Sequence, residues 1–129
     1  MALSHEVSGA VAVDVGGSGV RAAAVAKDGR MGAVERRELD ASLPRAEVCG
    51  RIADAVAASQ RNLVAQSHKV PFAVALAVAI PAFVLPDGTV SECPSLPALT
   101  GLDLAAELSA VAGGAVVRVV PDVAAAALG

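Results

Sequence analysis

Asp14 and the glycine-rich turn that follows it are the part of this sequence best suited to chemistry. The aspartate lies near the end of an alternating apolar run, and Gly16-Gly17-Ser18-Gly19 then turns the backbone. Glycines let a backbone approach a ligand closely and take positive φ angles without penalty. The N–H groups of such a turn point into one concavity that can hold a phosphate. A carboxylate at its rim suits Mg²⁺, which prefers to be held partly through water.

Two familiar nucleotide motifs are excluded at this turn. The spacing is not G-x-G-x-x-G, the residues after the turn indicate a strand rather than a helix, and no G-K-[ST] is present. A glycine-rich hairpin without a ligand is the alternative to a phosphate site, because motifs of this length also occur by chance.

A second carboxylate, Asp122, follows an apolar stretch near the end of the chain. Pro121 precedes it, and the fixed φ of proline suits the entry to a helix. Cys49 and Cys93 are the only cysteines, and without an export signal they are most simply two reduced thiols. Cys93 has two interpretations, a nucleophile or a buried small apolar residue, and the second role is the commoner one.

The apolar spacing predicts the elements that must position these residues. The helical spacing of Val48, Ile52 and Val56 indicates an amphipathic helix, and Asp28-Gly29 indicates a type I′ turn. The unbroken apolar run over 72–80 predicts a central strand that is buried on both faces. In chain order, the expected elements are strands over 10–15, 20–26 and 32–39, a helix over 45–66, a strand over 72–80, a loop over 81–101, a helix over 103–111, a strand over 115–120 and a helical start over 123–128.

This order predicts an α/β fold built on a mixed five-stranded sheet. A three-stranded antiparallel meander is followed by two parallel strands, with helices on the faces of the sheet. If the crossovers are right-handed, Asp14 and Asp122 lie at the same edge of the sheet, where α/β folds bind ligands. The long loop over 81–101 is of a length that is usually functional.

Length and composition limit the classes of function. A chain of 129 residues corresponds to one domain, and a net charge of −3 gives no support for a nucleic-acid or membrane partner. The absence of Trp and Tyr leaves little to stack on bases or sugar rings. The first residues lack the apolar core of a signal peptide, and no run of 18 apolar residues occurs, so we expect a cytoplasmic protein.

Three segments of the chain together resemble one family. D-V-G-G-S with Arg21 looks like the first phosphate loop of the sugar-kinase, Hsp70 and actin superfamily, and more narrowly of the bacterial sugar kinases and repressors called the ROK family. The stretch over 77–104, with A-V-A-I-P, D-G-T-V, P-S-L-P and G-L-D-L, resembles a second motif of that family. The stretch over 119–129, V-V-P-D-V-A-A-A-A-L-G, resembles a third. Their common order along the chain is more specific than any one of them.

The resemblance implies a ribonuclease H-like fold with helices on both faces of the sheet, and a glucokinase-like site. It implies that Asp122 is the general base that takes the proton from a sugar hydroxyl, while ATP and Mg²⁺ are the cofactors. Phosphoryl transfer needs an oriented nucleophile and charge neutralisation, which fits these roles. The implied ATP site consists of Asp14, Gly16, Gly17, Ser18 and Arg21, with Asp14 holding the metal, and the implied sugar site consists of Pro81, Ala82, Ser95 and Asp122.

The chain departs from the family pattern at several of these positions. The asparagine that the family has before the catalytic aspartate is Pro121 here, the one two residues after it is Ala124, and the loop asparagine is Ser95. The family glycine after the strand-end proline is Ala82. Because asparagine side chains supply donors and acceptors for sugar hydroxyls, the substrate and the activity itself stay open.

The resemblance also predicts how the chain is organised. It extends along residues 1–129 as a single domain but matches only the amino-terminal lobe of a two-lobed enzyme, so a carboxy-terminal lobe is an expected partner. A homodimer stays open, and DNA binding is disfavoured because few residues precede the first strand. The expected function is half of an ATP-dependent kinase for a hexose or N-acetylhexosamine. The alternative is a non-catalytic homologue that binds a ligand or a partner.

Overall fold

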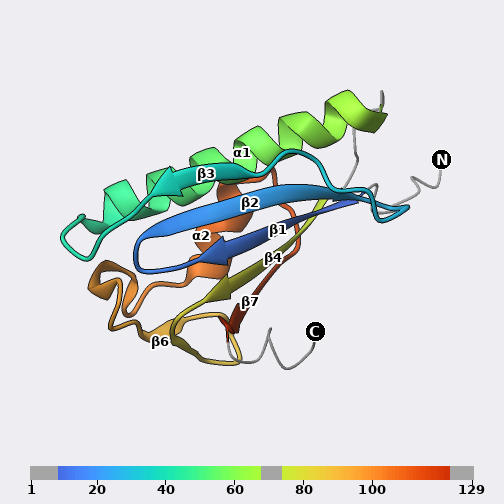
Figure 1. Ribbon diagram of the computed structural model, residues 1–129. Helices are drawn as coiled ribbons and strands as arrows, with labels where there is room; N and C mark the ends of the chain where they lie inside the picture. The colour runs from blue at the N-terminus through green and yellow to red at the C-terminus, as the bar shows by residue number, and fades with distance from the viewer. Residues whose placement is uncertain (1–8, 68–73, 123–129) are drawn as a thin grey trace.

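The protein is described by a computed structural model that covers residues 9–67 and 74–122. Its main sheet has the strand order β3-β2-β1-β4-β7, as Figure 1 shows. The first three strands pair antiparallel, whereas β4 runs parallel to β1 and β7 runs parallel to β4. The expected mixed sheet is therefore confirmed. Its strands are β1 (Gly9–Val15), β2 (Gly19–Ala26), β3 (Glu35–Glu38), β4 (Val74–Ile80) and β7 (Val117–Pro121).

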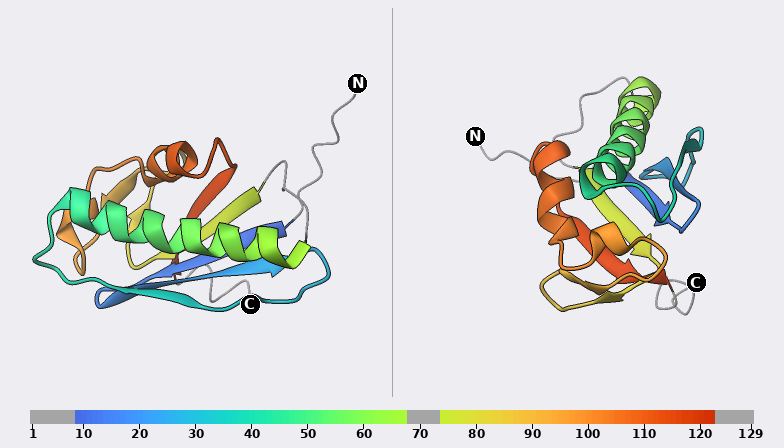
Figure 2. Two further views of the ribbon diagram at one scale, coloured as in Figure 1. Left: turned by 90° about the horizontal axis from the view of Figure 1, so that it is seen from above. Right: turned by 90° about the vertical axis from the view of Figure 1, so that its left-hand side faces the viewer.

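Both described helices cover the same face of this sheet. Helix α1 (Arg45–Ser67) packs on β2 and β3, and α2 (Leu104–Val111) packs on β7 and touches α1. Figure 2 shows the two helices side by side, with the sheet beneath them. The helical start expected over 123–128 lies outside the described residues, so the structure describes helices on one face only. No helix in the described ranges is long and apolar enough to cross a membrane.

The core lies between the sheet and these helices because the large apolar residues of the central strands β1 and β4 point to one side. In β4, Leu76, Val78 and Ile80 are fully buried, whereas Ala77 between them is exposed. The expectation of a strand buried on both faces is therefore wrong for this structure. The run alternates large residues with alanine, so only the large ones reach the core. The opposite side, which we call the open face, contains a shallow groove of about 400 Å³ whose lining includes Ala12, Ala23, Ala77 and Ala79.

The segment expected as a long loop over 81–101 has structure of its own. It forms a small hairpin from β5 (Phe83–Val84) and β6 (Val90–Glu92), followed by a single 3₁₀ turn, η1 (Pro97–Leu99). The backbone of Val90 exchanges hydrogen bonds of 2.8 and 2.7 Å with Leu102 and Gly101. Buried apolar side chains anchor the segment, and they are Val90, Cys93, Leu96, Leu99 and Leu102. Short strands of this kind were missed because no regular alternation marks them.

The hairpin between β2 and β3 also differs from the prediction. The Gly29 N–H donates to the Ala26 carbonyl at 2.8 Å, so Lys27 and Asp28 are the central residues of the turn. Gly29 follows them with a φ of 90°, which is typical of a turn ending in a glycine bulge rather than of type I′. Strand β3 consequently begins at Glu35, three residues later than expected.

The second helix begins one residue later than predicted and ends at the predicted residue. The Asp103 side chain caps α2 by accepting a hydrogen bond of 3.0 Å from the Ala106 N–H. At the other end, the Gly114 N–H donates to the Ser109 carbonyl at 2.8 Å, and Gly113 and Gly114 both have positive φ. This is the usual glycine termination of a helix.

Candidate functional site

The glycine-rich turn connects β1 to β2 at the end of the sheet where the parallel strands finish. The Gly16 N–H donates to the Gly19 carbonyl at 2.8 Å and closes the turn. None of its three glycines has a positive φ, so backbone freedom is not why they are needed. A Cβ on Gly17 would lie 3.0 Å from the Ser95 Cβ, and one on Gly19 would lie 3.1 Å from the Arg37 carbonyl. Close packing is therefore the reason for glycine at these two positions.

Two backbone donors of the turn remain available. Among the described residues, the N–H groups of Gly17 and Ser18 donate no hydrogen bond, and Ser18 is exposed. Successive free N–H groups in a turn form a cradle for an anion. The residues present therefore fit the phosphates of a nucleotide.

Asp14 is engaged with a neighbour across the strands. Its carboxylate accepts a hydrogen bond of 2.5 Å from the Arg21 guanidinium, and both side chains are about half exposed, at 52% and 57%. Exposed pairs of this kind contribute little to stability, so a ligand could compete with either partner. The described residues contain no cluster of three or more metal-ligating side chains. Asp14 alone fits Mg²⁺ only if phosphate oxygens and water complete the coordination, which is how Mg²⁺ is commonly held.

Ser95 and the turn approach each other although 78 positions separate Gly17 from Ser95 in the sequence. Arg45, the first residue of α1, fixes the loop that carries Ser95. Its Nε donates to the Ala98 carbonyl at 2.8 Å and its Nη2 donates to the Thr100 carbonyl at 2.7 Å. No signal in the sequence marks this role, because the partners are 53 and 55 residues away and are backbone atoms.

Cys93 lies next to Pro81, one of the predicted sugar-site residues. It is buried, and its Sγ lies 3.8 Å from the Pro81 carbonyl oxygen. Burial raises the pKa of the Cys93 thiol, and the negative charge of Asp122 raises it further. The thiol therefore stays protonated at neutral pH, which supports the buried apolar role over the nucleophile. The backbone turns directly beyond Pro81, where the Ala82 N–H donates to the Ile80 carbonyl at 3.0 Å.

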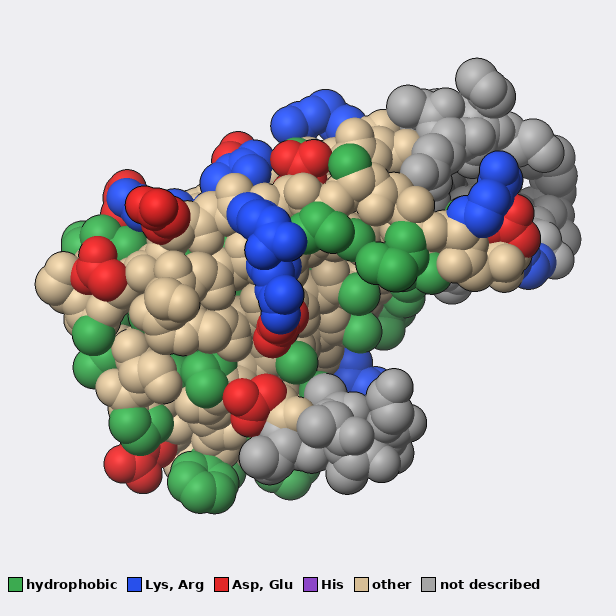
Figure 3. All heavy atoms as spheres, viewed as in Figure 1, with side chains coloured by type: hydrophobic (Ala, Val, Ile, Leu, Met, Phe, Trp, Pro, Cys, Tyr) green, Lys and Arg blue, Asp and Glu red, His purple; other side chains and the backbone are tan. Residues whose placement is uncertain are grey.

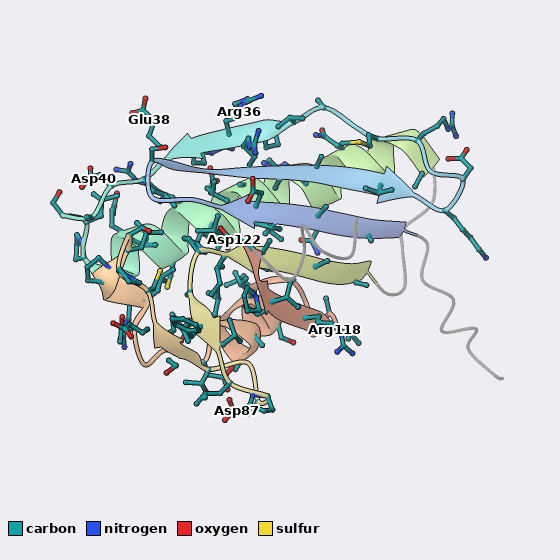
Figure 4. The ribbon with its side chains drawn as sticks, turned by 60° about the horizontal axis from the view of Figure 1, so that its bottom comes forward. Arg36, Glu38, Asp40, Asp87, Arg118 and Asp122 are labelled. Atoms are coloured by element: carbon teal, nitrogen blue, oxygen red, sulfur yellow. The ribbon has the colours of Figure 1, made fainter. Side chains whose placement is uncertain are left out.

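The two predicted carboxylates lie at the same edge of the sheet but not in contact. Asp14 is level with Ala79 on β4, and Ala79 is level with Val120 on β7. Two strand spacings therefore separate Asp14 from Val120, roughly 10 Å. Asp122 is exposed two residues further on, just beyond the end of β7, as Figure 4 shows. The edge therefore has room for a ligand between a phosphate cradle and a carboxylate.

An antiparallel meander whose first strand continues into a parallel row with β4 and β7, and whose first two strands are joined by a glycine-rich turn, is a fold of the actin and sugar-kinase class. The family model described as "ROK family" matches residues 10–129. The chain belongs to the ROK family.

Solved structures of this family share the fold. The ROK hexokinase of Thermus thermophilus is 20% identical, with a TM-score of 0.71, and the alignment covers 93% of this chain and 37% of that one. A ROK glucokinase from Streptomyces griseus, solved in complex with glucose and AMPPNP, is 26% identical, with a TM-score of 0.64 and coverages of 92% and 35%. A ROK transcriptional regulator homologous to the E. coli MLC protein is 19% identical, with a TM-score of 0.75 and coverages of 93% and 29%. No curated protein matches the chain significantly. The chain thus spans little more than a third of each of these structures, or less.

Proposed function

We propose that residues 1–129 form the amino-terminal lobe of an ATP-dependent sugar kinase, which transfers the γ-phosphoryl group to a hydroxyl of a hexose or N-acetylhexosamine. The close approach of Gly17 to Ser95 supports this function most directly, because it joins a phosphate cradle to a loop of the expected sugar site. A carboxy-terminal lobe would supply the remaining contacts to the nucleotide.

In this proposal each residue of the edge has one task. The N–H groups of Gly17 and Ser18, with Gly16 beside them, hold phosphate oxygens, and Arg21 neutralises their charge. ATP with Mg²⁺ supplies the phosphoryl group, and Asp14 holds the metal through water.

The acceptor side is formed by the end of β4 and by the loop that carries Ser95. Pro81, Ala82 and Ser95 shape the sugar site, and Asp122 accepts the proton of the attacking hydroxyl. Cys93 lies near both residues: its Sγ lies 3.8 Å from the Pro81 carbonyl oxygen, and the charge of Asp122 raises the pKa of its thiol. A carboxylate at this edge can act as a general base once the sugar hydroxyl lies within hydrogen-bond distance.

A non-catalytic homologue is the second candidate. Pro121 and Ser95 stand where the family has asparagines, and Ala124, the third such position, lies outside the described residues. In addition, Asp14 is paired with Arg21 rather than free. A protein with these features could bind a sugar or a partner without transferring phosphate, and one of the similar structures is a regulator.

Steady-state kinetics of the chain joined to its carboxy-terminal lobe distinguish the two candidates. If Asp122 is the base, Asp122→Ala lowers kcat by about 10²–10⁴-fold. Pro121→Asn is expected to lower the KM for the sugar, because it restores a side chain that can bond a hydroxyl. A full rate in Asp122→Ala would mean that Asp122 only begins a helix. No turnover in the wild-type protein with any hexose, despite intact sugar binding, would support the non-catalytic candidate.

A further inference from the structure

The two edge strands of the sheet differ in how well they resist pairing with a further strand. Strand β3, at one edge, consists entirely of charged residues, which is a common protection of a sheet edge. Figure 3 shows charged side chains gathered over β3 and α1. Strand β7, at the other edge, reads V-R-V-V-P, and Arg118 is its one charged residue. Charge therefore protects the β3 edge much more than the β7 edge.

The backbone of β7 has unused hydrogen-bonding groups along its outer side. The Leu76 N–H donates to the Val116 carbonyl at 2.9 Å, so Val116 and every second residue after it face β4. The alternate residues, Val117, Val119 and Pro121, turn their backbone groups away from β4. No other described residue bonds the N–H or the carbonyl of Val117 or Val119. An added strand could bond these groups.

A groove gives access to this outer side. It has a volume of about 440 Å³ and lies between residues 117–121 of β7, residues 84–88 of the β5–β6 hairpin and Ala105 of α2. Figure 1 shows the hairpin beside the end of β7. The turn of the hairpin packs closely on α2, because a Cβ on Gly88 would lie 2.9 Å from the Ala105 Cβ. The unused backbone groups of β7 therefore line one wall of a groove, and the packed hairpin forms the other.

Exposed apolar side chains surround the same edge. Phe83 and Leu85 belong to the hairpin, Val111 ends α2, and Val116 directly precedes β7. Phe83 is 71% exposed and Val116 is 74% exposed. The hairpin and α2 both contact β7, so these side chains flank the edge. Exposed apolar groups that gather in one region are typical of a surface that binds another protein.

Two charged residues indicate the chemistry of the segment that would bind here. Arg118 is exposed on the open face, level with Ala77, and makes no ion pair or hydrogen bond with another described residue. Asp87 lies on the hairpin wall of the groove, and Figure 4 shows the two residues on different segments. Side chains of an added strand alternate between the two faces of the sheet. Those on the open face would lie beside Arg118 and favour an acidic residue, whereas those on the other face would meet Leu85 and Asp87 and favour an apolar one.

A second copy of β7 fits this edge less well than an acidic segment. Pairing of two β7 strands would place two Arg118 side chains on the same face as near neighbours, and like charges in such positions are unfavourable. Pro121 also has no N–H to donate, so one outward position of each copy would leave a carbonyl of the other copy without a bond. Charge and hydrogen bonding therefore both favour a different partner.

We propose that the β7 edge binds an extended segment of a partner protein in which acidic and apolar residues alternate. The main chain of the segment pairs with Val117 and Val119, its acidic side chains lie beside Arg118, and its apolar side chains enter the groove beside Leu85. Addition of a strand to an exposed sheet edge is a recurring mode of peptide recognition. The proposal does not rest on the proposed kinase function, because these residues lie outside the proposed ATP and sugar sites.

Fluorescence anisotropy of this chain with labelled synthetic peptides tests the proposal. The main probe alternates valine and glutamate over about seven residues, enough to pair with the whole of β7. A second peptide has lysine in place of glutamate, and a third is the acidic peptide with methylated backbone nitrogens. The acidic peptide is expected to bind. The methylated peptide should bind about tenfold more weakly or less, since it cannot donate hydrogen bonds to β7, and the lysine peptide should also bind more weakly.

Variants of the two edge strands provide the matched comparison. Arg118→Glu should weaken the acidic peptide by about fivefold, the upper end for an exposed ion pair, and strengthen the lysine peptide. Arg36→Glu is the control, because it reverses an exposed arginine on β3, four strand spacings or roughly 19 Å away, well beyond the screening length of about 8 Å. It should change neither affinity. Val117→Pro removes an outward N–H without removing a bond to β4, and should weaken the acidic peptide by about tenfold.

Several outcomes would overturn the proposal. Equal binding of the acidic and methylated peptides excludes strand addition, and equal effects of Arg118→Glu and Arg36→Glu exclude the acidic partner. No binding of the acidic peptide at about 1 mM overturns both parts. Self-association of the chain in sedimentation that the acidic peptide reverses would assign the edge to a second copy instead. The methylated peptide is compared on the wild-type chain, so this comparison still decides the proposal if Val117→Pro fails to fold.

Discussion

Gly17→Ala should destabilise the protein, although glycine to alanine usually has the opposite effect. The added Cβ would lie 3.0 Å from the Ser95 Cβ, closer than ordinary contacts between such carbons, so the loop that carries Ser95 must move by a few tenths of an ångström. That loop is fixed by the two hydrogen bonds of Arg45 and cannot move freely. Overpacking of this kind lowers the free energy of unfolding by about 1–3 kcal/mol. Alanine also reduces the conformational entropy of the unfolded chain, which raises the free energy of unfolding by about 0.4–1 kcal/mol. The net loss is about 1 kcal/mol.

Gly50→Ala is the matched control for this change. Gly50 lies within α1, and a Cβ there meets nothing within 4 Å. The same substitution should therefore stabilise the protein by about 0.5–1 kcal/mol. For a chain of this length, 1 kcal/mol corresponds to about 4 °C in Tm, so the two variants should differ by roughly 7 °C.

Thermal unfolding followed by far-ultraviolet circular dichroism measures this difference, because α1 supplies a strong helical signal. Combining Gly17→Ala with Ser95→Gly removes the close contact, and should restore about 1 kcal/mol relative to the sum of the single changes. The Gly17→Ala variant should also bind phosphate more weakly. Equal Tm shifts of the same sign in Gly17→Ala and Gly50→Ala would refute the contact and the site built on it.

Three further predictions concern Arg45, the thiol of Cys93 and the activity of this chain by itself. Arg45→Met should lower the free energy of unfolding by about 1 kcal/mol, since two hydrogen bonds are lost at an exposed position. Urea unfolding measures this free energy, and an unchanged urea midpoint would contradict the role of Arg45. The raised pKa of Cys93 means that the folded state keeps a proton that the unfolded state releases, so this stability is complete below about pH 8.5 and is lost as the pH rises further. Urea midpoints at pH 7 and pH 9 should show a fall that is smaller in Cys93→Ala. The chain without a carboxy-terminal lobe should release no ADP in a coupled assay with hexoses, because no closure excludes water; turnover that vanishes in Asp122→Asn would contradict this.

The sequence by itself determined the helices and the main strands, which depend on local spacing, but not the type of the turn at Gly29. The helix over 45–66 was predicted within one residue of its observed end, because the spacing of Val48, Ile52 and Val56 extends over several turns. The helix predicted over 103–111 differs from α2 by one residue at its start, where Asp103 is the N-cap, and it ends at the predicted residue because termination by Gly113-Gly114 depends on neighbours in the chain. The parallel pairing of β1, β4 and β7 followed from the order of elements, because right-handed crossovers leave few alternatives.

Tertiary structure alone decided which distant residues meet. The contact of Gly17 with Ser95, the hydrogen bonds of Arg45 to the loop, and the groove between β7 and the β5–β6 hairpin all depend on strand register and on how loops pack. No local spacing encodes them, because their partners lie on other strands or are backbone atoms many residues away. The glycines of the turn illustrate the difference. The sequence predicts backbone freedom at these positions, whereas the fold requires glycine at 17 and 19 because other segments come too close for a Cβ.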